Sequence, residues 1–179
     1  MVLHWFLFLL LFSFQSPKIY VEHSRHINFF RVANFSKEPV QKYYWSTPPS
    51  IRLCENTEVS LTRVRQAVKY WEKIGYEFGE VYLDRFSFCM NPKYNEIAIV
   101  LPSQGVIDDK MGATRVYTSK LTGEIVKAKI FVLPSAARKE RVLEHEIGHA
   151  LGWQHYNSRG HIMHPNWWLG GHSSYGLRK

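Results

Sequence analysis

Cysteine and aspartate are scarce in this sequence, and it shows no internal repeat. Its 179 residues include two cysteines, Cys54 and Cys89, and three aspartates. Two thiols are too few for a four-cysteine zinc site, and the missing repeat excludes solenoid and propeller folds. An apolar fraction of 45% and a charged fraction of 21% exclude an intrinsically disordered or collagen-like chain. The length predicts one compact domain with a short extension.

Long apolar runs are also few: a single one covers residues 5–14 (WFLFLLLFSF). Ten residues suit the core of a signal peptide and are too few to cross a bilayer, which excludes multi-span membrane insertion. No Lys or Arg precedes the run, and no small-residue cleavage site follows it. We interpret residues 1–17 as a signal peptide or N-terminal anchor and expect a secreted or extracellular protein. The alternatives are a membrane-anchored or virion-associated protein, or a misassigned start codon.

Acidic residues are fewer than basic ones: the chain has 15 Asp and Glu and 23 Lys and Arg, which gives a formal net charge of +8. The positive charges are scattered along the chain rather than gathered in one block. This distribution allows weak attraction to anionic surfaces but does not predict specific nucleic-acid binding. We further expect the protein to be a monomer.

Two proline residues separate an aromatic N-terminal stretch from the main domain. Residues 18–47 have no clear hydrophobic period, and we interpret them as a pro-segment or linker of unknown role. Pro48-Pro49 marks the start of a domain that covers residues 48–179. Cys54 begins this domain and Cys89 precedes a strand, so the two are a candidate disulfide pair. Two inert buried thiols are the alternative.

Hydrophobic periodicity and turn residues predict two helices and five strands in the domain. One helix begins after Asn56 or Thr57 and ends at Gly75, and the second begins after Ser135 and ends near Leu151. The expected strands are residues 51–54, 80–88, 96–101, 113–118 and 125–133. This order of elements predicts an α/β or α+β domain with a mixed sheet.

The second helix contains a candidate metal site, His145-Glu146-Ile147-Gly148-His149. Residues four apart lie on one face of a helix, so both imidazoles can reach one ion. Glu146 is turned about 100° around the axis from His145 and can stand beside the ion without binding it. A catalytic zinc has three protein ligands and a water, so one ligand is missing from this pair.

His155 is the candidate third ligand. A straight helix would carry it away from the ion, but Gly152 can adopt a positive φ and turn the chain back. The full pattern is His-Glu-x-x-His-x-x-Gly-x-x-His, which predicts one bound divalent cation, Zn²⁺. Because three histidines complete the set, we expect the others nearby to be solvated or close to the site without binding the ion. These others are His161, His164 and His172.

This pattern resembles the zinc-binding signature of the metzincin metallopeptidases. Met163 follows eight residues after His155 and is similar to the methionine of the turn that underlies the zinc in that clan. Pro165 matches the matrixin form of the turn, although His161 stands where serine is usual. The chain is therefore most similar to the matrixins, specifically over residues 145–165 and architecturally over about 50–169.

For the fold, the resemblance implies a zincin-like catalytic domain. Its sheet would be twisted, mixed and mostly parallel with one antiparallel edge strand, and it would carry two main helices. Met163 and Gly152 would support the site. Substrate would pair with the edge strand at Gly112, Ala113 and Thr114.

For the function, the resemblance implies a zinc endopeptidase acting on polypeptides, with Glu146 as the general base that takes the proton of a metal-activated water. Pro165 and Trp167 would line the pocket for one substrate side chain, whereas we expect Trp168 to pack under the cleft. Asp108 and Asp109 are weak candidates for Ca²⁺, because two adjacent side chains rarely converge on one ion.

Two other functions stay open at this point. One is a non-cleaving, zinc-containing structural or surface-binding protein of the same fold, because only 14 residues follow Pro165 and matrixins usually have a further helix there. The intact Glu146 argues against it, since a structural zinc site needs no base. The other is hydrolysis of an amide outside proteins. Residues 18–47 also lack the cysteine that the matrixin pro-segment uses.

Overall fold

A computed structural model describes residues 19–22, 38–85, 89–103 and 110–179, and all structural statements below concern these residues. Their strands form one mixed sheet in the spatial order β1-β5-β6-β4-β2-β3. In chain order the strands are β1 (Ile19–Glu22), β2 (Ser50–Cys54), β3 (Val81–Asp84), β4 (Glu96–Val100), β5 (Gly112–Ser119) and β6 (Ile125–Val132). Strands β3, β2, β4 and β6 run parallel, and β5 is antiparallel to β6. The predicted fold class, a mixed and mostly parallel sheet with two helices, is confirmed. The strand predicted as the antiparallel edge strand is β5, but β1, which the sequence did not predict, pairs antiparallel with its outer side and lies at the edge.

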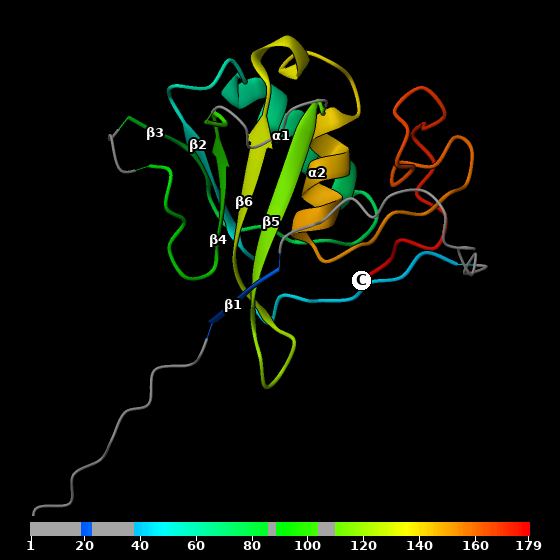
Figure 1. The fold of residues 1–179 in the computed structure, drawn as a ribbon, viewed down its shortest axis with the longest axis horizontal. Helices are drawn as coiled ribbons and strands as arrows, with labels where there is room; N and C mark the ends of the chain where they lie inside the picture. Colours follow the sequence, from blue (N-terminus) through cyan, green and yellow to red (C-terminus); the bar gives the residue numbers. More distant parts are fainter. Residues whose placement is uncertain (1–18, 23–37, 86–88, 104–109) are drawn as a thin grey trace, which may run out of the picture.

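The two helices lie on the same side of this sheet (Figure 1). All five residues of β4 are buried because both faces of this central strand are covered. Ile97 and Ile99 face the helices in the main core, whereas Ala98 and Val100 face a smaller cluster on the other side. That smaller cluster contains Cys54 and Cys89, which form a disulfide bond.

Helix α1 (Leu61–Glu72) buries one stripe of side chains against α2 and the sheet. Its buried residues are Val64, Ala67, Val68 and Trp71. The predicted cap at Asn56 or Thr57 is wrong, because the side chain of Ser60 accepts the hydrogen bond from the amide of Arg63. Gly75 has a φ of +101° just after the helix, which is the left-handed conformation expected where a helix ends.

Helix α2 (Val142–Ala150) is shorter than the sequence predicts. A 3-10 turn, Pro134–Ala136, follows β6, and Arg141 then has a φ of +68° immediately before the helix. A left-handed residue cannot continue a right-handed helix, so the predicted single helix from Ser135 is divided here. The predicted end near Leu151 agrees with the structure, and the chain from there to its C-terminus is irregular (Figure 1).

Residues 38–47 pack against the end of α2, although the sequence analysis assigned them to a pro-segment or linker. The side chains of Gln41 and Trp45 donate hydrogen bonds to the carbonyls of Leu151 and Ala150. The amide of Lys42 donates to the carbonyl of Gly152. This stretch therefore supports the turn that follows α2. In the part of the chain that the structure describes, no helix is long and apolar enough to cross a bilayer.

Candidate active site

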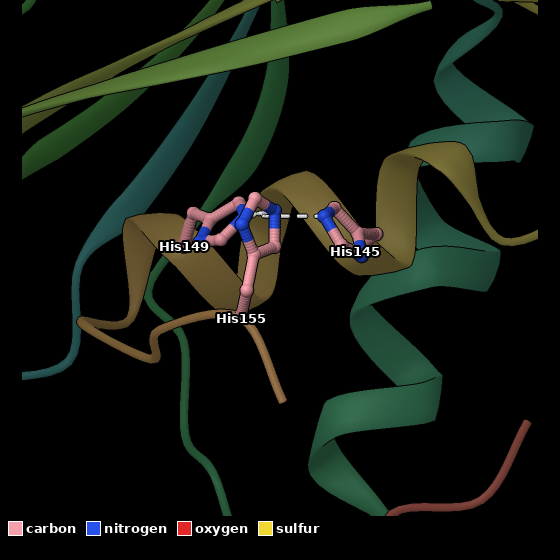
Figure 2. A group of neighbouring side chains, drawn as sticks. All are labelled: His145, His149 and His155. Atoms are coloured by element: carbon pink, nitrogen blue, oxygen red, sulfur yellow. Dashed lines mark hydrogen bonds between the residues drawn. The ribbon is translucent and has the colours of Figure 1, made fainter. Parts of the chain in front are cut away.

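Three imidazole rings converge at the C-terminal half of α2. His145 and His149 project from the helix, and His155 comes from the turn that follows it (Figure 2). The Nε2 atom of His149 lies 3.1 Å from Nε2 of His145 and 3.1 Å from Nε2 of His155. Among the described residues, these three form the one group of histidine, cysteine or acidic side chains whose ligand atoms lie close enough to share an ion.

The hydrogen bonds on the far side of the rings fix which nitrogen carries a lone pair. Nδ1 of His145 donates to the carbonyl of Ile162 at 2.7 Å, and Nδ1 of His149 donates to the carbonyl of Trp153 at 2.8 Å. In a neutral ring whose Nδ1 carries the hydrogen, Nε2 is a bare acceptor. Two such lone pairs facing each other repel unless a cation lies between them. Burial also lowers the pKa of His145 to about 4, which keeps the ring neutral.

The spacing of these nitrogens fits zinc. A tetrahedral Zn²⁺ binds imidazole nitrogen at roughly 2.0–2.1 Å, which places two nitrogen ligands about 3.3 Å apart. The contacts of 3.1 Å in the structure lie close to that separation. The three imidazoles, two of them oriented by backbone carbonyls, therefore match the donor set and the geometry of a zinc site with an open fourth position.

Gly152 makes the turn that returns His155 to the helix. Its φ is +95°, and a Cβ at this position would lie 2.0 Å from the carbonyl oxygen of Tyr43. The residue after it, Trp153, donates its amide hydrogen to the carbonyl of Gly148, which closes the end of the helix. Only glycine satisfies both the positive φ and the contact with residues 38–47.

Glu146 is buried beside the three histidines and faces β5. Its Oε2 accepts a hydrogen bond of 2.7 Å from the hydroxyl of Thr114 in β5. Burial raises the pKa of Glu146 to about 7, and the Thr114 hydrogen bond and the charge of Lys110 oppose that rise. The sequence analysis placed Thr114 among substrate-binding residues, but its side chain is directed at Glu146.

Met163 lies under α2 and is completely buried. It approaches Gly148 so closely that a Cβ there would lie 2.4 Å from its sulfur and 2.7 Å from the ring of Trp71. Sequence reasoning did not select Gly148. A signal was available, because glycine inside a helix costs about 1 kcal/mol relative to alanine and usually has a packing reason.

His161 and His164 have structural hydrogen bonds in the turn around Met163. His161 accepts the amide hydrogen of Met163 at Nδ1 and donates from Nε2 to the carbonyl of Tyr175. Burial lowers the pKa of His161, so the ring is held in the neutral form that this pattern requires. His164 accepts the amide hydrogen of Asn166, and His172 is exposed and lies 3.9 Å from Glu140. None of them belongs to the group that could share an ion.

A cleft of about 340 Å³ opens over the three histidines and Glu146. It brings together the residues that the sequence analysis assigned to substrate binding, namely Gly112, Ala113, Thr114, Pro165 and Trp167. The expectation that Trp168 packs under the cleft is wrong, because this residue is 83% exposed at the rim. The weak calcium candidates Asp108 and Asp109 lie outside the described residues.

The geometry is that of a mononuclear metallopeptidase centre: three imidazoles with an open position, and a buried carboxylate beside them in a cleft. Comparison with protein families identifies the class. The model of the matrixin family matches residues 45–179, and the chain therefore belongs to the matrixins, a family of zinc metalloendopeptidases. No curated protein matches the chain in a sequence search.

Proposed function

We propose that this protein is a zinc-dependent endopeptidase in which Glu146 is the general base. The observation that carries the proposal is the convergence of three Nε2 atoms beside a buried carboxylate, all of them lining one open cleft. A purely structural zinc site has four protein ligands and needs no base, so this arrangement favours catalysis.

His145, His149 and His155 would hold the zinc. When bound, the ion supplies Lewis acidity, which polarises the scissile carbonyl and lowers the pKa of a coordinated water. The carbonyls of Ile162 and Trp153 keep the rings of His145 and His149 oriented, so little rearrangement is needed when the ion binds.

Glu146 would accept the proton of the attacking water and then pass it to the leaving amine. Its carboxylate accepts a hydrogen bond from Thr114 and is enclosed by α2 and β5, which exclude bulk water from one side. Because His145, His149 and His155 supply the metal ligands, Glu146 does not need to bind the ion and would act only by transferring protons.

Substrate would bind as an extended chain against the outer edge of β5. Of the described residues, no strand pairs with this edge at residues 112–114, whereas β1 pairs with it at residues 116–119. The open amide and carbonyl groups next to Glu146 can therefore hydrogen-bond to a peptide backbone. Pro165 and Trp167 would line the pocket that receives one substrate side chain.

We also propose a secreted or extracellular location, because matrixins typically act there and because residues 1–17 have the composition of a signal peptide.

The test compares the zinc-loaded full-length protein with its Glu146→Gln variant on an unfolded polypeptide. We expect wild type to cleave internal bonds, and the variant to bind one zinc per chain and lose at least 99% of the turnover, in line with the 10²–10⁴-fold contribution of a general base. Thr122→Ala, in the turn after β5, is a control that should retain activity. Full activity in Glu146→Gln would refute the role, and a zinc-loaded but inert wild type would favour the non-cleaving alternative.

A further inference from the structure

Arg141 occupies a strained position on the wall of the cleft. It has a φ of +68°, which is uncommon for any residue other than glycine, and it immediately precedes α2. Its half-buried side chain lines the cleft next to Val142 and Trp167. Asparagine or glycine would fit this backbone with less strain, so the arginine side chain itself needs an explanation.

The guanidinium group is fixed on Trp167. It lies over the indole ring at 4.7 Å from the ring centre, and its Nη1 donates a hydrogen bond of 3.1 Å to the carbonyl of the same residue. The indole nitrogen of Trp167 donates in turn to the carbonyl of Glu140 at 2.9 Å. These contacts join the segment before α2 to the segment after Met163 and form a rigid, cationic pocket wall.

The charge on this wall has no acidic partner within the part of the chain that the structure describes, because no carboxylate there lies within ion-pair distance of Arg141. Lys110 and Arg115 also line the cleft. Glu146 is the one acid among its described lining residues, and the proposed mechanism already uses that carboxylate. Among the described residues, the lining of the cleft therefore carries more positive than negative charge.

We propose that Arg141 is a specificity-determining residue that selects substrates with an acidic side chain, glutamate above all, in the pocket beside Trp167. This inference rests on the proposed endopeptidase function and names its substrate class. The methylene groups of a glutamate would pack on the indole and on Val142, while its carboxylate meets the guanidinium.

The physical reason is desolvation. A docked peptide displaces water from the guanidinium; an apolar or basic side chain gives no hydrogen bond in return, and a neutral amide gives only a weaker, uncharged one. A carboxylate restores a charge-assisted hydrogen bond in a site of lowered dielectric, for which a preference of about tenfold or more is expected. Because Trp167 already holds the guanidinium in place, little side-chain entropy is lost when the carboxylate binds.

The first experiment locates the preference. A library of peptides randomised around a central bond is digested with the zinc-loaded full-length enzyme, and the ends of the products are sequenced. We expect glutamate to be enriched at one fixed position next to the cut, ahead of glutamine by about tenfold in kcat/KM. If wild type cleaves no peptide at all, the proposed function fails and this inference with it. If it cleaves peptides without an acidic preference, only this inference is overturned.

The second experiment assigns the preference to Arg141. Asparagine and aspartate tolerate a positive φ, so Arg141→Asn and Arg141→Asp test loss and reversal of the charge without added backbone strain. We expect the preference for the Glu peptide over the matched Gln peptide to fall below twofold in Arg141→Asn, and the matched Lys peptide to become the best substrate of Arg141→Asp. Arg138→Asp, an exposed position outside the cleft, changes the net charge equally and should keep the wild-type preference.

A binding measurement makes the result independent of turnover. Zinc-loaded Glu146→Gln, with and without Arg141→Asn, is titrated with the Glu and Gln peptides, and the change in tryptophan fluorescence gives each Kd. We expect the roughly tenfold difference in Kd to disappear with Arg141→Asn. Thermal unfolding and zinc content, measured for every variant, separate a specificity change from misfolding. An unchanged difference in a folded, zinc-loaded variant would overturn the proposal.

Discussion

The hydroxyl of Thr114 lies 2.7 Å from Oε2 and 3.0 Å from the backbone oxygen of Glu146, and so links β5 directly to the helix that carries His145 and His149. Both residues are buried. Thr114 is the third residue of β5, and its backbone belongs to the edge on which we expect substrate to lie. The strand that would hold the peptide therefore also orients the carboxylate that would act on it.

Removing this hydroxyl should weaken catalysis more than binding. Thr114→Val keeps the shape of the side chain but leaves the Glu146 carboxylate without its hydrogen-bond donor, at a cost of about 1–3 kcal/mol. We expect kcat to fall about tenfold or more with little change in KM, because the backbone edge that pairs with substrate is preserved. Thr114→Ser restores the hydroxyl and should recover most of the activity. Equal losses in both variants would contradict an orienting role for the hydrogen bond.

The metal-free protein should lose stability between pH 4.5 and 7 on account of Glu146. The carboxyl has a pKa of about 7 in the folded protein and an ordinary value of 4.5 when exposed. Between these values the folded state holds more protons than the unfolded state, so the free energy of unfolding decreases as the pH rises. His145, whose pKa is lowered to about 4, has the opposite effect between pH 4 and 6.5.

Comparing metal-free wild type with metal-free Glu146→Gln isolates the carboxyl, because His145 is present in both proteins. Relative to wild type, the variant should gain roughly 3 kcal/mol of unfolding free energy between pH 4 and pH 8, as an upper value from the pKa difference. Urea denaturation at both pH values measures this gain. A difference between the two proteins that does not change with pH would show that the folded-state pKa of Glu146 is not raised.

Gly152→Ala should destabilise the protein much more than Gly75→Ala. The two glycines have similar φ values, +95° and +101°, so the backbone strain of the substitution is similar, at about 1–2 kcal/mol. Only Gly152 has a neighbour in the way, the carbonyl of Tyr43, whereas a Cβ at Gly75 meets nothing within 4 Å. We expect Gly152→Ala to lose about 2 kcal/mol or more of unfolding free energy beyond the loss in Gly75→Ala, which denaturation measures. We also expect it to bind zinc more weakly, which metal titration measures. Equal effects would mean that residues 38–47 do not pack as described.

A buried ion-pair group at the far side of the sheet should be important for stability. Arg52 in β2 lies 3.1 Å from Asp84 and 2.7 Å from Glu96, and all three side chains are at most 11% exposed. Arg52→Met leaves two carboxylates buried without their cation, which is expected to cost about 3–5 kcal/mol. The exposed pair Arg85–Glu55, tested as Arg85→Met, should change stability by less than 1 kcal/mol. A small effect of Arg52→Met would show that water reaches the group.

The sequence predicts strands β2 to β6 and the grouping of three histidines because these features depend on local spacing, but it does not predict β1. The turn at Thr122-Gly123 that separates β5 from β6, and the i, i+4 spacing of the histidines in α2, are such local signals. The fold class, which is confirmed, was predicted from such local patterns together with the resemblance to the metzincins. The role of each site residue stays a prediction until activity is measured.

Features that depend on distant parts of the chain could not be predicted in this way. Arg141, where the predicted second helix is divided, contacts Trp167, and a Cβ at position 148 would clash with Met163 and Trp71. The hydrogen bond from Thr114 to Glu146 joins residues 32 apart in the chain. Tertiary packing decides all of these positions, and it leaves no periodic signal in the sequence.

A crystal structure of the zinc-loaded protein, with anomalous diffraction recorded on both sides of the zinc absorption edge, tests whether the three histidines share one zinc ion. We expect one zinc peak among the Nε2 atoms of His145, His149 and His155, at roughly 2.0–2.1 Å from each. We also expect the Glu146 carboxylate to lie beside the ion without binding it. An ion bound elsewhere, or imidazoles that point in different directions, would contradict the proposed zinc site.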